Sequence, residues 1–399
     1  MNTISEHLQT PILGKYDVIV CGGGIAGVTA AVSAARQGRS VLLIEKSIQL
    51  GGLATIGLIS WYEPLCDGKG NRVMNVMTHE LLELCIKHGF HTLDDSWKDG
   101  AVHSDSRKRM CTYFSHSLFA MALDSFVLDS GVTILLDTYV TATNVKNNRI
   151  EGIFIENKDG RGYYKCSMVV DCTGDADIAI QSGLNYEDGL NYLTYIAYHS
   201  DLSMCEEAYT RKNIMNSRKW LNSGSDLFGR GHPEDSPHYL GINATELTDF
   251  VIRGRKKLFE KVIKEEPFFR DITVLPSMPQ YRKTRRIIGK ETLHEEDAGK
   301  HFDSSIAALA DFTKRGVLYE IPYETLFNEQ VENLFVAGRC ISSTGWAWDV
   351  TRVIPAVAAT GQACGTAAAL CCELGNSNDS LSIENLQNDL IKQDVWLHF

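Results

Sequence analysis

Short apolar runs alternate with helical periodicity near the start of the chain, and this pattern predicts a βαβ unit. Tyr16 to Cys21 is an apolar run that predicts a strand, and Ser40 to Ile44 predicts the next one. Between them, an alanine-rich segment ending near Gln37 predicts a helix. Strands that alternate with helices in this way are typical of a parallel sheet.

The rest of the chain divides into segments of different hydrophobic period. Helical spacing predicts helices at 73–88 and 113–128. We then expect strands at 132–136, 139–145, 150–156, 162–166 and 168–171, with hairpin turns at 147–148 and 158–160. After residue 182 the pattern predicts a strand at 193–199 and helices near 205–219 and 247–265. A buried strand at 332–339 and an apolar helix from Ile354 to Leu374 complete the chain.

These elements predict an α/β fold. We expect a Rossmann-like nucleotide-binding domain with a parallel sheet and a β-meander, plus an inserted α+β substrate domain. The nucleotide-binding domain is expected to comprise residues 1–181, of which 72–130 are mostly helical, and to resume at 321–399. Residues 182–320 form the expected insertion.

A glycine turn joins the first expected strand and helix. Gly22, Gly24 and Gly27 have the spacing GxGxxG, and Glu45 ends the second expected strand. The first glycine permits the tight turn, the second lets the backbone approach a pyrophosphate, and the third lets helix pack on strand. An acid at the end of the second strand would take the ribose hydroxyls and disfavour a 2′-phosphate, so the pattern indicates a dinucleotide other than NADP.

Two further segments are candidates for contact with the same ligand. The run Gly51-Gly52-Leu53-Ala54-Thr55 follows the second strand closely, and its glycines would allow the backbone to approach the diphosphate. An expected buried strand ends in Asp171, followed by Thr173-Gly174. Either run would otherwise be an ordinary loop.

Composition and charge exclude several classes of protein. The 399-residue chain is 44% hydrophobic with a net charge of −11, which argues against nucleic acid as the main partner. The 11 cysteines form no CxxC pair, which argues against a zinc site, an iron–sulfur cluster or a redox dithiol. We expect reduced thiols, no metal site, no signal peptide, no membrane span and a cytoplasmic location.

The assembled motifs resemble those of FAD-dependent oxidoreductases of the glutathione-reductase-like superfamily. The resemblance is strongest to small stand-alone relatives of fumarate reductase flavoproteins. It covers residues 22–45, 51–52, 171–175, 282–289 and 333–369, with poorly matched stretches at 60–110 and 200–275. It implies an FAD bound in an extended conformation.

The resemblance also assigns roles along the FAD. Glu45 would hold the adenosine ribose, Val140 would meet the adenine through its backbone, and Thr173-Gly174 would cover the diphosphate. Gly338, Arg339 and residues 352–356 would lie near the ribityl chain and the flavin ring. The full expected cofactor-binding set is Gly22, Gly24, Ile25, Ala26, Gly27, Glu45, Lys46, Gly51, Gly52, Leu53, Ala54, Thr55, Val140, Thr173, Gly174, Gly338, Arg339, Arg352 and Ala356.

Two features mark the region expected near the flavin: a helix N-terminus and a sequence difference from the family. A helix that begins at Ile354 would direct its positive end toward the reduced flavin and raise its potential, or would merely pack on the sheet. Gly345-Trp346 stands where many relatives carry His-Glu, so no role of that histidine carries over. Trp346 and Trp348 would wall an aromatic pocket or serve only in packing.

Three residues are candidates for catalysis. One arginine among Arg282, Arg285 and Arg286 would clamp a substrate carboxylate, and the family match favours Arg285; the alternative is a solvated basic face. His199 is a candidate base, with a hydrogen-bonded core or rim histidine as the alternative. Asp349 lies close in sequence to Arg352, the expected flavin contact.

The sequence thus predicts an FAD-dependent oxidoreductase: a dehydrogenase, oxidase or reductase that moves hydride between a small polar substrate, at CH–OH or CH–CH, and flavin N5. No CxxxxC follows the first glycine motif and no second GxGxxG occurs, so a disulfide reductase or an enzyme with its own nicotinamide domain is not expected. The electron partner is expected to be the substrate itself, oxygen, a quinone or a separate electron donor or acceptor. The alternatives are an isomerase or eliminase with an internal redox step and a non-catalytic electron-transfer subunit, whereas the acidic charge disfavours a tRNA-modifying flavoprotein.

Overall fold

A seven-stranded sheet organises the molecule. The computed structural model describes residues 3–97 and 109–399. The sheet has the order β5-β2-β1-β8-β7-β6, and β16 also pairs with β8. Its strands are β1 (Ile12–Cys21), β2 (Val41–Ile44), β5 (Thr133–Leu135), β6 (Tyr139–Lys146), β7 (Arg149–Asn157), β8 (Gly160–Asp171) and β16 (Leu334–Val336).

The parallel half of this sheet carries the expected βαβ unit. β1, β2, β5 and β16 are joined by parallel pairings, with β8 between β1 and β16. The last four residues of β1 and all of β2 are buried. Strands that are buried on both faces have continuous apolar sequences, so the apolar runs predicted β1 and β2 correctly. The carboxyl ends of β1, β2 and β8 therefore meet at one edge of the sheet.

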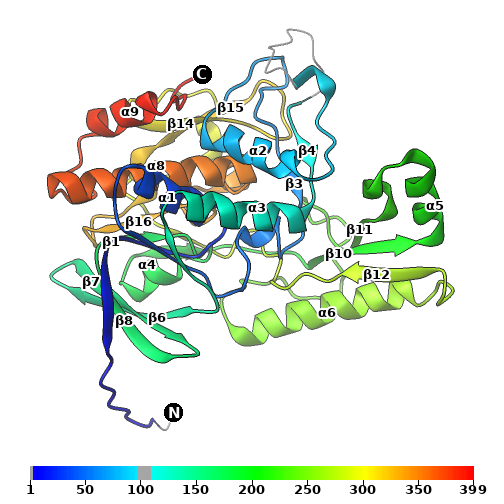
Figure 1. The fold of residues 1–399 in the computed structure, drawn as a ribbon, viewed down its shortest axis with the longest axis horizontal. Helices are drawn as coiled ribbons and strands as arrows, with labels where there is room; N and C mark the ends of the chain where they lie inside the picture. Colours follow the sequence, from blue (N-terminus) through cyan, green and yellow to red (C-terminus); the bar gives the residue numbers. More distant parts are fainter. Residues whose placement is uncertain (1–2, 98–108) are drawn as a thin grey trace.

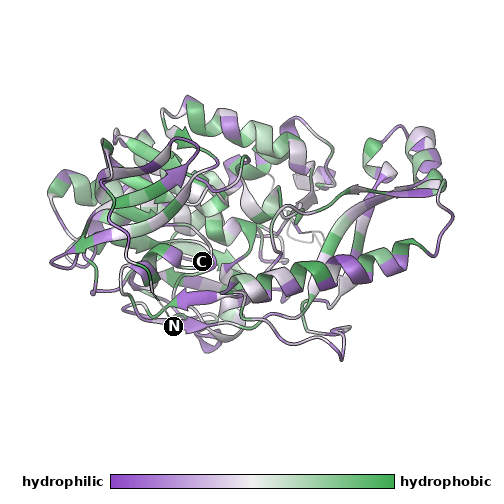
Figure 2. Ribbon diagram, turned by 90° about the horizontal axis from the view of Figure 1, so that it is seen from below, coloured by the Kyte–Doolittle hydropathy of each residue, from purple (hydrophilic) through white to green (hydrophobic). Residues whose placement is uncertain are grey.

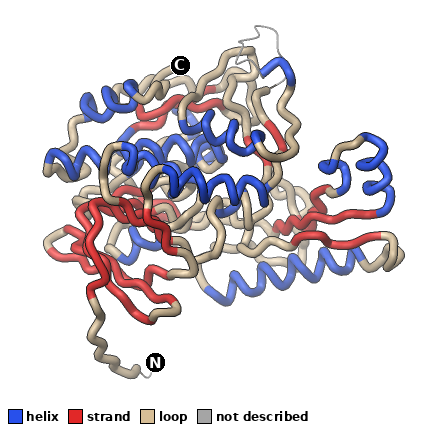
Figure 3. Tube along the Cα trace, in the orientation of Figure 1, coloured by secondary structure: helices blue, strands red, loops and turns tan. Residues whose placement is uncertain are grey.

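The meander differs from the expectation at one place. Two expected strands, at 162–166 and 168–171, are a single strand, β8, which pairs antiparallel with β7 and parallel with β1. The first half of β8 belongs to the meander and the second half to the core. The hydrophobic pattern therefore changes within one strand, and this change resembled a break. Figure 3 shows the meander strands as a block beside the helices.

Two helices pack closely over the sheet, as Figure 1 shows. α1 (Ile25–Arg36) and α8 (Ile354–Leu374) make extensive mutual contact. A Cβ on Gly361 would lie 2.2 Å from the Ala26 carbonyl oxygen, and one on Gly365 would lie 2.2 Å from the Ala30 carbonyl oxygen. Glycines on α8 thus allow the two backbones to approach, and this packing covers the glycine turn from one side.

α8 differs from the expectation that no segment could span a membrane. Among the described residues it is the helix long and apolar enough to do so by length and composition. Its apolar window is nevertheless 94% buried inside the protein. A helix that is apolar all round and enclosed by protein has the character of a core helix.

A second unit projects from the side of the main sheet (Figure 1). Its sheet has the order β11-β10-β12, with β10 (Thr194–Asp201), β11 (Lys219–Gly224) and β12 (Arg270–Val274). α6 (Ala244–Val262) packs on one face through residues spaced by four, namely Phe250, Gly254, Leu258 and Val262. Figure 2 shows hydrophilic and hydrophobic residues alternating along this long helix. The helix expected at 205–219 is shorter, α5 (Leu202–Arg211), because the chain then forms the 3₁₀ helix η3 (Ile214–Ser217) and enters β11 at Lys219.

The remaining elements surround these two sheets. They are the helices α2 (Met77–Lys87), α3 (His116–Asp129), α4 (Asp177–Gln181), α7 (Gly345–Thr351) and α9 (Ile383–Lys392), the 3₁₀ helices η1 (Gly52–Ala54), η2 (Asp95–Trp97), η3 (Ile214–Ser217), η4 (Glu295–Asp297) and η5 (Tyr323–Leu326), and the strand pairs β3 (Trp61–Tyr62) with β4 (Thr112–Tyr113), β9 (Tyr186–Asp188) with β13 (Arg285–Ile287), and β14 (Ser305–Ala310) with β15 (Leu318–Pro322). β14 lies in the range expected for the insertion, yet Ile306 and Leu309 belong to the core that contains α1 and α8. All 11 cysteines are free thiols.

Candidate functional site

Two glycine turns lie side by side at the carboxyl edge of the sheet. Gly24 forms a parallel backbone bridge with Gly51, and the Gly51 N–H donates to the Gly23 carbonyl oxygen at 2.8 Å. The first turn connects β1 to α1, and the second follows β2. The backbones of both turns are therefore available to one ligand, as expected from the two sequence motifs.

The three glycines of the first turn differ in what an added side chain would meet. Gly22 has φ +102°, a conformation that favours glycine. A Cβ on Gly27 would lie 1.8 Å from the Gly22 carbonyl oxygen, so helix and turn could not meet. A Cβ on Gly24 would meet no atom within 4 Å. The chain leaves this space open at the N-terminus of α1, where free backbone N–H groups can bind phosphate.

Glu45 is held at the end of β2. Its Oε2 accepts from the Gly23 N–H at 2.6 Å, and its Oε1 accepts from the Ser47 N–H at 2.8 Å. The residue is 8% exposed, whereas the adjacent Lys46 is exposed. Each carboxylate oxygen keeps a further acceptor site, so the carboxylate has capacity for a ribose hydroxyl.

A third segment of chain reaches this edge through Arg339. Its Nε donates to the Gly174 carbonyl oxygen at 2.6 Å, and its Nη2 pairs with the Asp175 carboxylate at 2.6 Å. Thr173 caps the end of β8 by donating its hydroxyl to Asp171 at 2.7 Å. Burial raises the pKa of the Asp171 carboxyl to about 6 despite these hydrogen bonds. Arg339 thus ties the turn after β8 to the turn after β16, where Gly338 has φ +86°.

The other expected cofactor residues lie on the same elements or next to them. Val140 is half-buried on β6 opposite Ile155, and Arg352 lies between α7 and α8. The rest occupy the first turn of α1, the η1 turn and the first turn of α8: Ile25, Ala26, Gly52, Leu53, Ala54, Thr55 and Ala356. These residues therefore follow one edge of the sheet from the meander to α8.

A charged cluster surrounds the junction of α7 and α8. The Asp349 carboxylate accepts from Lys283 Nζ at 2.8 Å, and from Nε and Nη2 of Arg352 at 3.0 and 2.8 Å. Burial alone would raise the pKa of Asp349, but Arg352 and Lys283 hold it below its ordinary value. Burial, together with the charge of Arg352, lowers the pKa of Arg282 to about 10. Three cations therefore gather around one carboxylate.

Asn191 fixes the segment that supplies two of these cations. Its Oδ1 accepts from the backbone N–H of Arg282 at 2.8 Å and of Lys283 at 2.9 Å. Arg282 also donates Nη1 to the Asp226 carbonyl oxygen at 2.8 Å. The inserted unit thereby places two cations beside the start of α8.

Glu63 adds a titratable group at the same place. Its Oε2 accepts from the Ile354 N–H at 3.3 Å, at the N-terminus of α8. Burial raises the pKa of the Glu63 carboxyl to about 7, although this hydrogen bond and the charge of Arg352 favour the ionised form. A carboxyl with this pKa exchanges protons near neutral pH.

The structure does not bring Arg285 and His199 to this cluster. Arg285 forms an ion pair with Asp177 and donates Nε to the Asp175 carbonyl oxygen at 2.8 Å, so it anchors the turn after β8. His199 lies on β10 and shares its face with Tyr195 and Ala197, which pack against α6. Burial lowers the pKa of the His199 imidazole. Asp349 is the one expected catalytic residue that lies within the cluster.

The two tryptophans of the α7 segment differ in environment. Trp348 is buried and donates Nε1 to the Arg339 carbonyl oxygen at 2.5 Å, which is a packing role. Trp346 donates Nε1 to Asp311 at 2.6 Å and stacks with Phe312 and Phe228. Trp346 is thus part of an aromatic group with Phe312 and Phe228.

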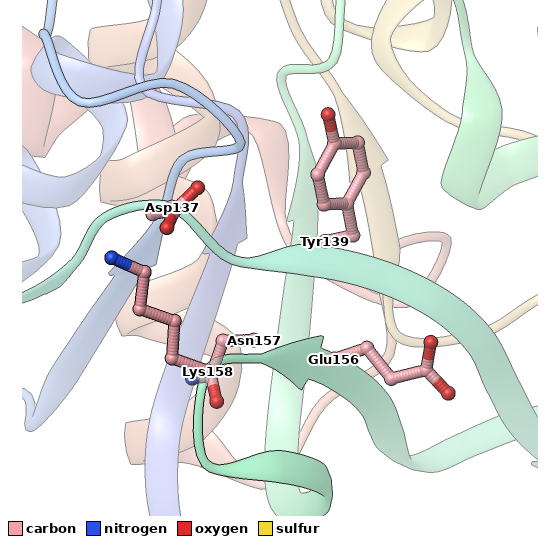
Figure 4. A pocket seen from close by; sticks show the side chains of 5 residues that line it. All are labelled: Asp137, Tyr139, Glu156, Asn157 and Lys158. Atoms are coloured by element: carbon pink, nitrogen blue, oxygen red, sulfur yellow. The ribbon is translucent and has the colours of Figure 1, made fainter.

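A shallow hollow lies on the solvent side of the meander. Asp137, Tyr139, Glu156, Asn157 and Lys158 line it, from the start of β6 and the end of β7 (Figure 4). None of these residues belongs to the expected cofactor or catalytic set. The Asp137 N–H donates to the Ser47 carbonyl oxygen at 3.1 Å, so the hollow lies beside the segment that follows Glu45.

A comparison with protein families identifies the class to which this fold and site belong. The family described as "FAD dependent oxidoreductase" matches residues 17–192 and 241–390. The chain belongs to this family, and its cofactor is FAD. The unmatched residues 193–240 include all of β10, α5 and β11.

Individual relatives are more distant. The chain is 38% identical to bilirubin reductase of Mediterraneibacter gnavus (strain CC55_001C) over 81 residues, which are 20% of this chain and 12% of that protein. It is 23% identical to Protein FixC of Salmonella typhi over 261 residues, which are 60% of this chain and 55% of that protein. The chain thus matches less than two thirds of the length of these relatives.

The fold is similar to that of a solved monooxygenase structure. p-Nitrophenol 4-monooxygenase PnpA from Pseudomonas putida DLL-E4 superimposes with a TM-score of 0.51 at 12% identity, covering 96% of this chain and 89% of that one. At this identity the similarity concerns the fold alone. It agrees with the predicted Rossmann-like α/β architecture.

Two residues of the charged cluster were missed by sequence reasoning. Glu63 lies in the stretch 60–110, where the sequence resemblance was weak although the family match includes it, and nothing in its spacing marks it. Lys283 stands beside Arg282 in a basic run whose arginines alone were candidates for binding a substrate carboxylate. Only the fold places both residues at the start of α8.

Proposed function

We propose that this enzyme transfers hydride between a small organic acid, at a CH–OH or CH–CH carbon, and the N5 atom of FAD. The observation that carries the proposal is the group of Arg282, Lys283 and Arg352 at the α7–α8 junction. Lys283 and Arg352 contact the ionised Asp349, Arg282 interacts with the charge of the same carboxylate, and the excess of cations over Asp349 suits a substrate carboxylate.

The residues of the two glycine turns suit FAD. The open space at Gly24 and the α1 N-terminus would receive the diphosphate, and Glu45 would accept from the ribose hydroxyls. When bound, FAD supplies a ring that accepts or gives hydride. The N-terminus of α8 would direct its partial positive charge toward that ring and favour the reduced anion.

Within this arrangement we assign different tasks to the charged residues. Lys283 and Arg282 would bind the substrate carboxylate, and Asp349 would orient Lys283 and Arg352. Glu63 would take or give the proton that accompanies hydride transfer, because its pKa of about 7 lets it do either. The ionised Asp349 is a weaker base, and Arg285 and His199 are engaged elsewhere.

Several finer expectations remain part of this proposal. They are the relation to the glutathione-reductase-like superfamily and to fumarate reductase flavoproteins, a separate electron donor or acceptor, and a cytoplasmic location. A redox-neutral isomerase or eliminase would use the same cluster. Net consumption of an electron acceptor during turnover distinguishes hydride transfer to a second partner from an internal redox step.

The test is an anaerobic screen that follows loss of flavin absorbance. We expect hydroxy acids or saturated acids to bleach the flavin, and their neutral methyl esters to do so at least tenfold less efficiently. Lys283→Met should raise the concentration of acid needed for half-maximal bleaching, while Lys256→Met, on the exposed face of α6, should not. Equal bleaching by esters and acids would exclude the carboxylate site.

A further inference from the structure

A second cluster of ligating side chains lies around the β14–β15 hairpin. Glu320 is on β15 and is 1% exposed. His301 precedes β14, and His398 lies in the segment that follows α9; both histidines are exposed. None of the three takes part in the cofactor or substrate site described above.

The spacing of the three side chains suits a metal ion. His301 Nδ1 lies 3.3 Å from Glu320 Oε2, and His398 Nδ1 lies 3.0 Å from the same oxygen. The ligating atoms all lie within 4.8 Å of one another. Around a tetrahedral zinc ion with bonds near 2.0–2.1 Å, ligand atoms are about 3.3 Å apart. The exposed rings can rotate to close the remaining difference.

The surrounding structure holds the ligands in place. The Ser305 hydroxyl donates to the Leu397 carbonyl oxygen at 2.6 Å, and the Ala308 N–H donates to the Trp396 carbonyl oxygen at 3.0 Å. These bonds dock the segment that carries His398 against β14. The Phe302 N–H donates to Glu320 Oε2 at 2.8 Å, which orients the buried carboxylate.

The Asp303 carboxylate lies beside the second ring nitrogen of His301. His301 Nε2 lies 3.4 Å from Asp303 Oδ1. A proton on Nε2 that points to this carboxylate leaves the Nδ1 lone pair directed at Glu320. Histidines that bind metal commonly donate their other ring N–H to a carboxylate, which fixes the tautomer.

We propose that His301, Glu320 and His398 bind one divalent transition-metal ion, with Zn²⁺ as the best-suited ion. Two imidazoles and one carboxylate suit Zn²⁺, Ni²⁺ or Cu²⁺ rather than Ca²⁺ or Mg²⁺, which prefer oxygen ligands. A fourth position remains for water. The bound ion links the segment before β14, β15 and the segment after α9, so its effect is to stabilise this side of the protein.

Calorimetric titration of ZnCl₂ into the full chain, without an affinity tag and freed of metal with a chelator, tests this proposal. We expect one ion per chain and a rise in melting temperature with zinc. His398→Ala should weaken binding at least tenfold, whereas His7→Ala, an exposed histidine outside the cluster, should not. His301→Ala should match His398→Ala, and both exposed positions tolerate alanine without loss of the fold.

Calcium and magnesium serve as controls, and neither should raise the melting temperature. If the two histidines and Glu320 form only ion pairs, the wild type will bind no zinc, and the proposal is overturned. It is also overturned if zinc binds equally to the wild type and to both histidine variants, because the free cysteines would then be the ligands. Flavin content and substrate bleaching are independent of these results.

Discussion

Gly24→Ala separates cofactor binding from folding, because the chain leaves the space beside this residue open. The added Cβ meets no atom within 4 Å, and the backbone of Gly24, with φ −65° and ψ 179°, suits any L-residue. Replacing glycine by alanine at a helix N-cap costs up to about 1 kcal/mol. Alanine also restricts the unfolded chain more than glycine does, which stabilises the folded state by about 0.4–1 kcal/mol. The apo-protein should therefore keep its stability to within about 0.5 kcal/mol.

The same methyl group occupies the space that we assign to the diphosphate. Loss of one charge-assisted hydrogen bond from the α1 N-terminus costs about 1.5–3 kcal/mol. Since about 1.4 kcal/mol corresponds to a tenfold change, FAD should bind roughly 10- to 150-fold more weakly. Affinity should thus fall while the fold persists.

Two other glycines provide matched controls. Gly27→Ala brings a Cβ within 1.8 Å of the Gly22 carbonyl oxygen and should cost at least about 3 kcal/mol of folding free energy. With an unfolding entropy of about 0.8 kcal/mol/K for 399 residues, the apo melting temperature should fall by roughly 4 °C. Gly14→Ala adds a Cβ at an ordinary 3.5 Å from Tyr164 and should change neither property.

The assay combines apo-protein melting by circular dichroism with FAD titration by flavin fluorescence. If Gly24→Ala binds FAD as tightly as the wild type, the diphosphate does not lie at this turn and the reasoning fails. It fails equally if the apo-variant melts as early as Gly27→Ala, because the space at Gly24 would then not be open.

Three further outcomes are expected. The pKa of the Glu63 carboxyl is about 7 in the folded protein and 4.5 as an ordinary carboxyl, so its ionisation destabilises the folded state as pH rises from about 4.5 to 7. Glu63→Gln should therefore stabilise the apo-protein by up to about 3 kcal/mol at pH 8 and not at pH 4, as measured by urea unfolding. Equal effects of the substitution at both pH values would contradict this assignment. The pH profile of kcat/KM should lose an ionisation near pH 7 in the same variant, and a retained ionisation would exclude Glu63 as the proton-transfer group. Gly361→Ala, whose Cβ would lie 2.1 Å from Thr29 Oγ1, should separate α1 from α8 and lower the melting temperature, whereas Gly14→Ala serves again as the neutral control.

Parts of the fold that depend on local patterns could be predicted from the sequence. The βαβ unit follows from buried apolar runs and from glycines whose steric need arises within one turn, as at Gly22 and Gly27. The continuous strand β8 could not be recognised, because its two halves face different environments. The length of α5 was overestimated because the last part of the expected helix forms the 3₁₀ helix η3 and leads into β11, which is defined by pairing with β10.

The sequence by itself determined the glycine turns and the acid at the end of β2, because these lie within a few dozen residues of one another. It also determined the family, because an ordered set of motifs occurs along the chain. Only the tertiary structure brought Glu63 and Lys283 to the start of α8, and only it gathered His301, Glu320 and His398. Spacing along the chain cannot reveal such groups, because their members are separated by many residues and meet only when distant segments pack.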